Sequence, residues 1–195
     1  DRFKNWLADG CDGGLEYLRR NTGKRFDPGA LCEGARSVIV CGVGYHRPPS
    51  AHEVASRIAS YAHSRDYHLT IRERLNELSA YLRELVPGAS GRVFTDTAPL
   101  AEKSWAVEAG LGWIGRNSLL ANPRLGSFLL LGEVVTTAEL EPDAPFVRDG
   151  CGTCRACVDA CPVAAIRPDR TIDAGRCISR RTIETGDGDE GDLHG

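Results

Sequence analysis

Four of the eight cysteines stand in one short run whose spacing indicates metal chemistry. The run reads Cys151-x2-Cys154-x2-Cys157-x3-Cys161-Pro162, which is the spacing of a bacterial iron–sulfur ligand run, including its terminal proline. The alternative is a zinc site, but four-cysteine zinc sites usually use two separated Cys-x2-Cys pairs. The spacing therefore favours an iron–sulfur cluster held by thiolates.

A fifth cysteine, Cys177, follows this run. The fourth cysteine of such a run usually binds a different cluster from the first three, so we expect Cys161 and Cys177 to serve a second cluster. Two 4Fe-4S clusters need eight thiolates, and the region that carries the run has five. We therefore predict that it does not hold two complete clusters by itself.

The other three cysteines, Cys11, Cys32 and Cys41, are scattered through the first part of the chain. The amino terminus shows no signal-peptide pattern, so we expect a cytoplasmic location, where disulfides are rare. Free cysteines of this kind usually behave as small buried hydrophobic residues. We predict that role for these three.

Composition excludes several classes of protein. Of the 195 residues, 42% are hydrophobic and 26% charged, as in ordinary globular proteins and unlike disordered or fibrous chains. No run of about eighteen apolar residues is present, so no transmembrane helix is predicted. The chain has no Met and opens with Asp1, and we expect it to be part of a longer protein.

The net charge of −3 is unevenly distributed. Residues 184–195 contain five acidic and no basic residues, so residues 1–183 carry 24 − 22 = +2. The acidic, glycine-rich segment 184–195 is predicted to be a disordered tail. The small positive excess elsewhere neither requires nor excludes a nucleic-acid partner.

Strand-like and helical patterns alternate over residues 1–140. Short β-branched apolar runs predict buried strands at 37–43, 92–96 and 128–136. Helices are predicted at 15–20, at 53–64, at 71–85, where Pro87-Gly88 follows, and from Pro99 to about Ala109. The alternation predicts an α/β (or α+β) domain over 1–140, followed by a ferredoxin-like 4Fe-4S module over 148–183.

In order along the chain, several stretches resemble the epoxyqueuosine reductase family, whose cobalamin-dependent members act in queuosine synthesis on tRNA. They are Ser64-Arg-Asp-Tyr-His68, Thr95-Asp-Thr-Ala-Pro-Leu-Ala-Glu-Lys103, Ala109-Gly-Leu-Gly-Trp-Ile-Gly-Arg-Asn-Ser118, Gly126-Ser-Phe-Leu-Leu-Leu-Gly-Glu133, the cysteine run and Arg176-Cys-Ile-Ser179. Where the family continues into a second cysteine motif and helical repeats, this chain has its acidic tail. The resemblance implies that residues 1–140 bind cobalamin and that two 4Fe-4S clusters supply electrons.

The resemblance also implies a role for Asp96 as the proton donor beside cobalamin. Reductive opening of an epoxide with loss of water needs a proton on the departing oxygen, which a carboxylic acid can supply. The alternative from the residues alone is that Asp96 caps the helix predicted after it, since Asp favours such positions. The two roles are compatible.

Further cofactor-contacting residues follow from the resemblance. They are Arg20, Tyr61, Asp96, Gly112, Trp113, Asn117 and Ser127. The segment 110–117 has glycines that let a flat macrocycle approach the backbone, although a tight turn under a core Trp113 is the alternative. Asp66-Tyr67-His68 is compared with the cobalamin motif Asp-x-His-x-x-Gly, but Ile71 replaces its glycine, so no histidine ligand to cobalt is expected.

The function expected from these observations is reduction of epoxyqueuosine to queuosine in tRNA by a monomeric enzyme served by an external electron donor. Two alternatives remain open. One is a relative of the reductive dehalogenases, which would use the same cofactors on a small halogenated substrate. The other is a ferredoxin-like electron carrier without enzymatic activity, which would bind no corrin. Visible spectroscopy after incubation with cobalamin separates the carrier from the two enzymes.

Overall fold

The computed structural model describes residues 2–47 and 58–184. Within these residues, no helix combines the length and the apolar character that crossing a membrane requires. The predicted tail lies outside the described residues from residue 185 onward, as does the first part of the helix predicted at 53–64. In the described remainder of that segment, Ser60–His63 forms the 3₁₀ turn η3 instead of an α-helix.

The chain forms two compact units. One, here called the sheet unit, contains Gly23–Trp113 and Leu120–Arg148. The other, here called the cysteine unit, is built from Asp1–Thr22, Ile114–Leu119 and Asp149–Gly195. Each unit is described separately below.

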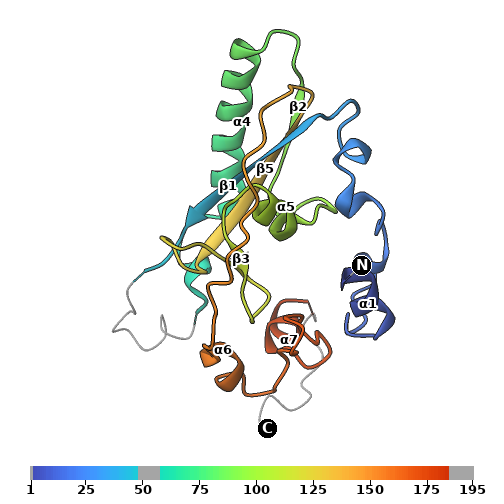
Figure 1. Cartoon of the computed structure of the whole chain (residues 1–195), viewed down its shortest axis with the longest axis vertical. Coiled ribbons are helices and arrows are strands. Elements are labelled where there is room, and N and C mark those ends of the chain that lie inside the picture. The colour runs from blue at the N-terminus through green and yellow to red at the C-terminus, as the bar shows by residue number, and fades with distance from the viewer. Residues whose placement is uncertain (1, 48–57, 185–195) are drawn as a thin grey trace. The chain divides into compact units, whose positions relative to one another are not determined.

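A three-stranded antiparallel sheet forms the centre of the sheet unit (Figure 1). Strand β5 (Leu129–Thr136) lies between β1 (Ser37–Gly44) and β2 (Gly91–Phe94). Valine and isoleucine dominate β1, whereas leucine and valine dominate β5. β-Branched side chains such as valine and isoleucine pack well on a pleated surface. All three strands were predicted, and the structure confirms them to within about two residues at their ends.

Helix α4 (Tyr67–Leu85) covers one face of this sheet. Its side chains Ile71 and Leu75 are buried and pack against Val134 of β5. The helix starts where the Asp66 side chain accepts a hydrogen bond from the His68 N–H, which satisfies one of the free donors of the first turn. It ends just before Pro87, as predicted, because proline cannot continue the backbone hydrogen-bonding pattern.

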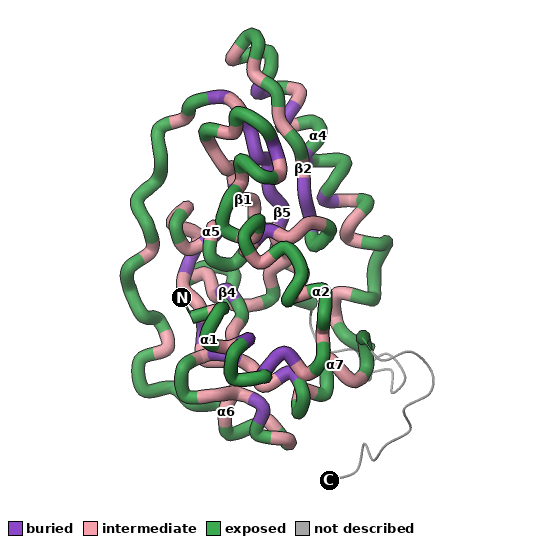
Figure 2. Tube along the Cα trace, turned by 90° about the vertical axis from the view of Figure 1, so that its right-hand side faces the viewer, coloured by how far each residue is buried: buried purple, intermediate pink, exposed green. Residues whose placement is uncertain are grey.

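The opposite face carries a second cluster of buried residues, which includes Phe94, Leu100 and Val135. Alternate residues of a strand point to opposite faces, so Val134 contacts α4 while Val135 lies in this second cluster. Helix α5 (Glu102–Glu108) contributes its Trp105 to the same cluster. In Figure 2 the tube is buried along much of β5 and at Phe94, the last residue of β2.

The prediction that Pro99 opens the helix before Ala109 is wrong. The residues after Pro99 make a turn, in which the Leu100 N–H donates to the Ala98 carbonyl, and α5 begins only at Glu102. The physical reason is that this turn places the Leu100 side chain in the core, where it is 4% exposed. The burial of this side chain outweighs the helix-starting preference of proline.

Several short elements complete the chain. They are the 3₁₀ turns η1 (Lys24–Phe26) and η2 (Pro28–Ala30), the strands β3 (Trp113–Ile114) and β4 (Leu120–Ala121), and the helices α1 (Arg2–Ala8), α2 (Glu16–Arg19), α6 (Ala156–Asp159) and α7 (Ile178–Ile183). Helix α2 falls within the helix predicted at 15–20. The two residues of β3 fall in the glycine-containing segment 110–117.

The cysteine unit joins the start of the chain to its later part. The Trp6 indole N–H donates to the Ile172 carbonyl at 2.6 Å, and the Ala174 N–H donates to the Cys11 carbonyl at 2.8 Å. Gly13 approaches the backbone so closely that a Cβ there would lie 2.6 Å from the Gly175 nitrogen. The structure therefore differs from the predicted domain 1–140, because these long-range contacts tie residues 1–22 to the cysteine module.

Candidate active site and cysteine module

Asp96 follows β2 and has a left-handed backbone, with φ of 50°. This conformation is uncommon for residues other than glycine, and it persists where neighbouring contacts hold it. The preceding Thr95 is buried, and its hydroxyl donates to the Leu131 carbonyl at 3.0 Å. This anchor leaves the Asp96 side chain exposed at the end of the strand.

The Asp96 carboxylate is held by a tyrosine of α4. The Tyr67 hydroxyl donates to Asp96 Oδ2 at 3.0 Å. Burial, followed by the charge of Asp96, raises the pKa of Tyr67 above its ordinary value. Tyr67 therefore remains a neutral hydrogen-bond donor to Asp96 throughout the physiological range.

Glu102, the first residue of α5, also contacts Asp96. Its Oε1 accepts a hydrogen bond from the Asp96 backbone N–H at 2.7 Å. Burial is the main cause that raises the pKa of Glu102 to about 7; the hydrogen bond from the Asp96 N–H lowers the pKa, and the nearby charge of Asp96 raises it. Glu102 is therefore an acid whose proton is exchangeable near neutral pH.

These contacts correct the interpretation of Asp96 as a helix cap. The residue that caps α5 is Ala101, and no side chain donates to or accepts from the first turn at that position. Instead, the side chain of Glu102, the first residue of α5, accepts a hydrogen bond from the Asp96 backbone N–H.

Glu133 lies behind this pair, in the middle of β5. Its side chain is fully buried, and neither carboxyl oxygen has a hydrogen-bond partner among the described residues. Burial, together with the smaller effect of the charges of Glu102 and Asp96, raises its pKa to about 9. At neutral pH Glu133 is therefore a neutral, protonated acid.

The predicted cofactor residue Tyr61 lies beside this site. Its ring meets that of Tyr67 edge-on, with the ring centres 6.1 Å apart. The His68 ring stacks on Tyr67 at 4.0 Å, and its Nδ1 lies 2.8 Å from Asp66 Oδ1. The structure thus brings Tyr61, Tyr67 and Asp96 together.

The remaining predicted cofactor residues are divided between the two units. Gly112, Trp113 and Ser127 belong to the sheet unit, and Arg20 and Asn117 to the cysteine unit. Only glycine fits at position 112, because a Cβ there would collide with the Ala121 carbonyl.

Local contacts account for three of the other side chains. The Trp113 ring stacks on Phe146, with centres 5.7 Å apart. Arg20 makes an exposed ion pair with Glu16, and Asn117 Oδ1 accepts the Leu119 N–H. The roles of these residues toward a cofactor stay predictions.

The sequence analysis did not single out Tyr67, Glu102 or Glu133 as site residues. A signal for Glu133 was present, because it is the only charged residue in the apolar segment that forms β5. A lone charge in a strand that is buried on both faces has to be paired or neutralised.

The cysteine run has backbone features that suit thiolate ligands. The Cys161 Sγ accepts the Ala165 N–H at 3.3 Å, and this bond, with smaller contributions from neighbouring N–H groups, lowers the pKa of the thiol. Gly152 and Ala164 adopt positive φ, which turns the chain sharply on each side of α6. Hydrogen bonds from backbone N–H groups to sulfur are a common feature of iron–sulfur ligands.

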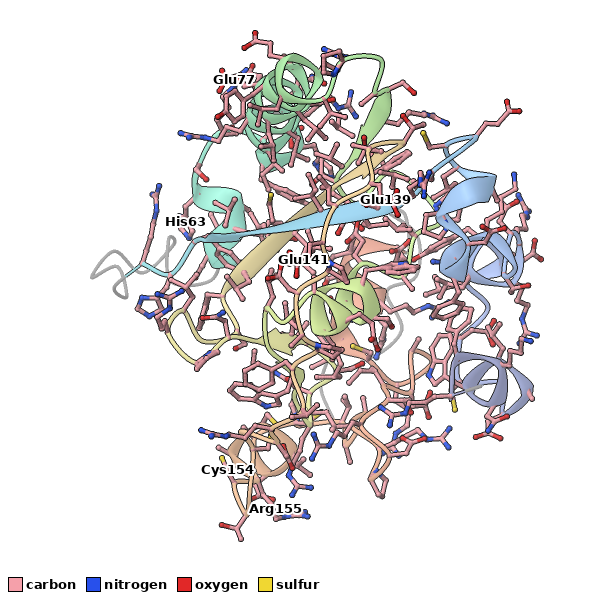
Figure 3. The ribbon with its side chains drawn as sticks, turned by 45° about the horizontal axis from the view of Figure 1, so that its top comes forward. His63, Glu77, Glu139, Glu141, Cys154 and Arg155 are labelled. Carbon is pink, nitrogen blue, oxygen red and sulfur yellow. The ribbon has the colours of Figure 1, made fainter. Side chains whose placement is uncertain are left out.

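Cys154 is exposed and lies with Arg155 in the loop that enters α6 (Figure 3). Across the described ranges, no three His, Cys, Asp or Glu side chains gather closely enough to hold a metal ion. The cysteine thiols are thus of a suitable chemical type to be cluster ligands. They would have to come closer together to bind one cluster. None of the described cysteines forms a disulfide, and Cys151, Cys154, Cys157, Cys161 and Cys177 remain the predicted ligands.

The three scattered cysteines differ from one another. Cys32 is buried in the sheet-unit core, as predicted, and Cys41 is half-buried. Cys11 is also buried, but it lies in the cysteine unit, where Arg167 donates to its sulfur. Cys11 is far from the cysteine module in the sequence but belongs to the same compact unit in the fold.

The sheet carries a cluster of acids at one strand end, and the same chain carries an iron–sulfur ligand run. Together these features indicate the class of redox proteins that combine a catalytic domain with a cluster module. Comparison with known proteins identifies the group within this class. A family model described as epoxyqueuosine reductase QueG, DUF1730, matches residues 25–97. A model of a 4Fe-4S double cluster binding domain matches residues 150–192.

Individual proteins agree with these models. The epoxyqueuosine reductase of Cyclobacterium marinum is 44% identical over 185 residues, which cover 94% of this chain and 60% of the relative. The structure of the Streptococcus thermophilus epoxyqueuosine reductase superposes with a TM-score of 0.85 at 32% identity, over 95% of this chain and 50% of the other. An epoxyqueuosine reductase solved with a modified tRNA-Tyr stem loop gives 0.76 at 28% identity, over 92% and 48%.

The chain is similar to epoxyqueuosine reductases over nearly its whole length. It spans about 60% of the length of curated relatives such as that of Cyclobacterium marinum.

Proposed function

We propose that this chain takes part in the reduction of epoxyqueuosine to queuosine at the wobble position of tRNA, with Asp96 as the proton donor. The observation that carries the proposal is the arrangement of acids around Asp96 in a chain that is similar to epoxyqueuosine reductases. The relative that was solved with an epoxyqueuosine-modified stem loop supports tRNA as the partner. A tRNA substrate in turn favours a cytoplasmic location.

The chemistry needs both electrons and protons. Two electrons and two protons convert the epoxide into the alkene and release its oxygen as water. Asp96 would deliver a proton to this oxygen as the carbon–oxygen bond breaks, which keeps a poor leaving group from departing as an anion. Its exposed carboxyl group at the end of β2 is accessible to a substrate, and Tyr67 and Glu102 hold it in position.

An aromatic surface beside Asp96 suits a large flat cofactor such as cobalamin. Phe128 is 40% exposed, and its ring meets the Tyr45 ring edge-on at 5.5 Å. Tyr45 interacts electrostatically with Tyr61, which contacts Tyr67 next to Asp96. An apolar, partly exposed surface that leads to a carboxyl group fits a macrocycle placed against the acid.

In this proposal Tyr61, Gly112, Trp113 and Ser127 of the sheet unit would contact cobalamin. Cobalamin, when bound, supplies the strongly reducing centre that the epoxide requires, and electrons from an external donor would enter through the cysteine module. The chain's own residues bind the cofactor, orient the substrate and donate the proton.

The decisive variant is Asp96→Asn, which keeps the shape of the side chain but cannot act as an acid. In the protein loaded with clusters and cobalamin, we expect turnover of epoxyqueuosine tRNA to fall roughly a hundredfold to ten-thousandfold. The visible spectrum of bound cobalamin should be unchanged. Asp143→Asn, at an exposed position of the same unit, is the matched control and should retain full turnover.

Near-normal turnover of Asp96→Asn would remove Asp96 from the mechanism. A second variant tests the cobalt environment. His68→Ala should still bind cobalamin, because no histidine ligand is expected. Loss of cofactor binding in a folded His68→Ala protein would show that this expectation is wrong.

A further inference from the structure

Three carboxyl groups from three different segments meet at one place in the sheet unit. Glu133 of β5 pairs with Phe94 of β2 in the antiparallel register. Asp96 lies two residues beyond Phe94, so it leaves the strand next to the position of Glu133, and Glu102 reaches Asp96 from the start of α5. Neighbouring strands place such residues within interaction distance.

Burial of Glu133 without a partner requires that it be neutral. An unpaired carboxylate in a protein interior costs more free energy than protonation of the group. The described titratable groups that interact with Glu133 are Asp96, Glu102 and the Cys41 thiol of β1. All three are acids, so none of them stabilises a negative charge on Glu133. Lys103 is the nearby cation, and it interacts with Glu102 and Asp96.

We propose that Glu102 is the proton store for Asp96, and that the protonated Glu133 behind it is a positioning residue that leaves Glu102 able to release its proton. This inference rests on the proposed function of Asp96. After Asp96 gives its proton to the leaving oxygen, the O–H bond of Glu102 breaks and its proton passes to the Asp96 carboxylate. Glu102 then takes a proton from water, and no electrons are involved.

The order in which these acids ionise supports the proposal. Glu102, with a pKa of about 7, is close to half-protonated at neutral pH, which is where proton transfer in both directions is most effective. Glu133, with a pKa of about 9, keeps its proton under the same conditions. An ionised Glu133 would hold the Glu102 proton more tightly, because a nearby negative charge raises the pKa of a carboxyl group, and a neutral Glu133 does not.

The first test uses the chain without any cofactor. Carbon-13 NMR of glutamate side-chain carboxyl groups should show two groups that titrate well above the ordinary value of 4.5. Glu102→Gln should remove the lower of the two and Glu133→Gln the higher. Glu139→Gln, which changes an exposed residue paired with Arg36 just after β5 (Figure 3), should remove neither. Ordinary titration of every glutamate would overturn the proposal.

The second test uses the protein loaded with clusters and cobalamin. Glu102→Gln should leave the first turnover intact when the protein is mixed from acidic buffer, but should slow later turnovers roughly a hundredfold. Glu102→Asp, which restores an acid at the same position, should recover part of that loss. Steady-state turnover of Glu102→Gln equal to that of the unchanged protein would overturn the proton store.

The two proposals fail in different ways. If Asp96→Asn retains turnover, the proposed role of Asp96 fails, whatever the titration shows. If Asp96→Asn is inactive while Glu102→Gln turns over normally, the proton store fails and the proposed function stands. Far-UV circular dichroism of each variant establishes that it is folded before its activity is compared.

Discussion

Replacing Glu133 with Gln should make the stability of the protein less dependent on pH. The amide has the same shape and is also buried without partners, but it does not ionise. In the unchanged protein, the carboxyl group holds its proton up to a pKa of about 9 when folded and loses it near 4.5 when unfolded. The unfolded state therefore releases this proton first as the pH rises, which destabilises the folded state.

The size of the effect follows from these two values. Stability attributable to Glu133 is fully present below about pH 4.5 and is lost as the pH rises towards 9, at about 1.4 kcal/mol per pH unit. The 2.5 units between 4.5 and pH 7 correspond to roughly 3 kcal/mol. At pH 7 the Gln variant should therefore be more stable by an amount of this order, and at pH 4 the two should be nearly equal.

Urea unfolding of the cofactor-free chain, followed by circular dichroism at several pH values, measures this difference. Glu139→Gln serves as the control, because its carboxylate is exposed, and its curve should run parallel to that of the unchanged protein. If the free-energy curves of Glu133→Gln and the unchanged protein are also parallel between pH 4 and 8, Glu133 is not a neutral acid in the fold and the reasoning fails.

Three further outcomes are expected. Tyr67→Phe removes the hydroxyl that donates to the Asp96 carboxylate and should cost about 1 kcal/mol in urea unfolding at pH 7. Gly132→Ala places a Cβ 2.7 Å from a side-chain carbon of α4 and should lower the free energy of unfolding by about 1–3 kcal/mol. After anaerobic reconstitution, Cys157→Ser should reduce iron and sulfide per chain, whereas Cys32→Ala, in the sheet-unit core, should lower stability in urea and leave the iron content unchanged.

The regular elements were predictable because their patterns are local. Val38 to Val43 form an apolar, β-branched run, and the spacing of Ile71 and Leu75 matches one face of a helix. Both patterns depend only on neighbours in the sequence. The start of α5 was not predictable in this way, because it depends on where the Leu100 side chain finds the core.

The candidate site was predictable only in part. Asp96 followed from the family resemblance, but its left-handed backbone is held by Thr95 and Glu102 through contacts that no local pattern encodes. Glu133 shows the same limit, since its meaning depends on the strand register that places it beside Phe94. Cys11 illustrates the limit over the longest range, because its contact with Arg167 joins opposite ends of the chain.

The position of β5 at the centre of the sheet determines how a nascent chain can fold during translation. Strands β1 and β2 both pair with β5 and not with each other, so neither has a partner until residues 129–136 have left the ribosome. Residues 2–22 gain their long-range contacts later still, because these contacts are made with segments that follow residue 148. Pairing over such sequence distances is slow, and unpaired strand edges promote aggregation. Until residues 129–136 have emerged, the growing chain therefore presents two unpartnered apolar strands, which favour aggregation unless they are shielded.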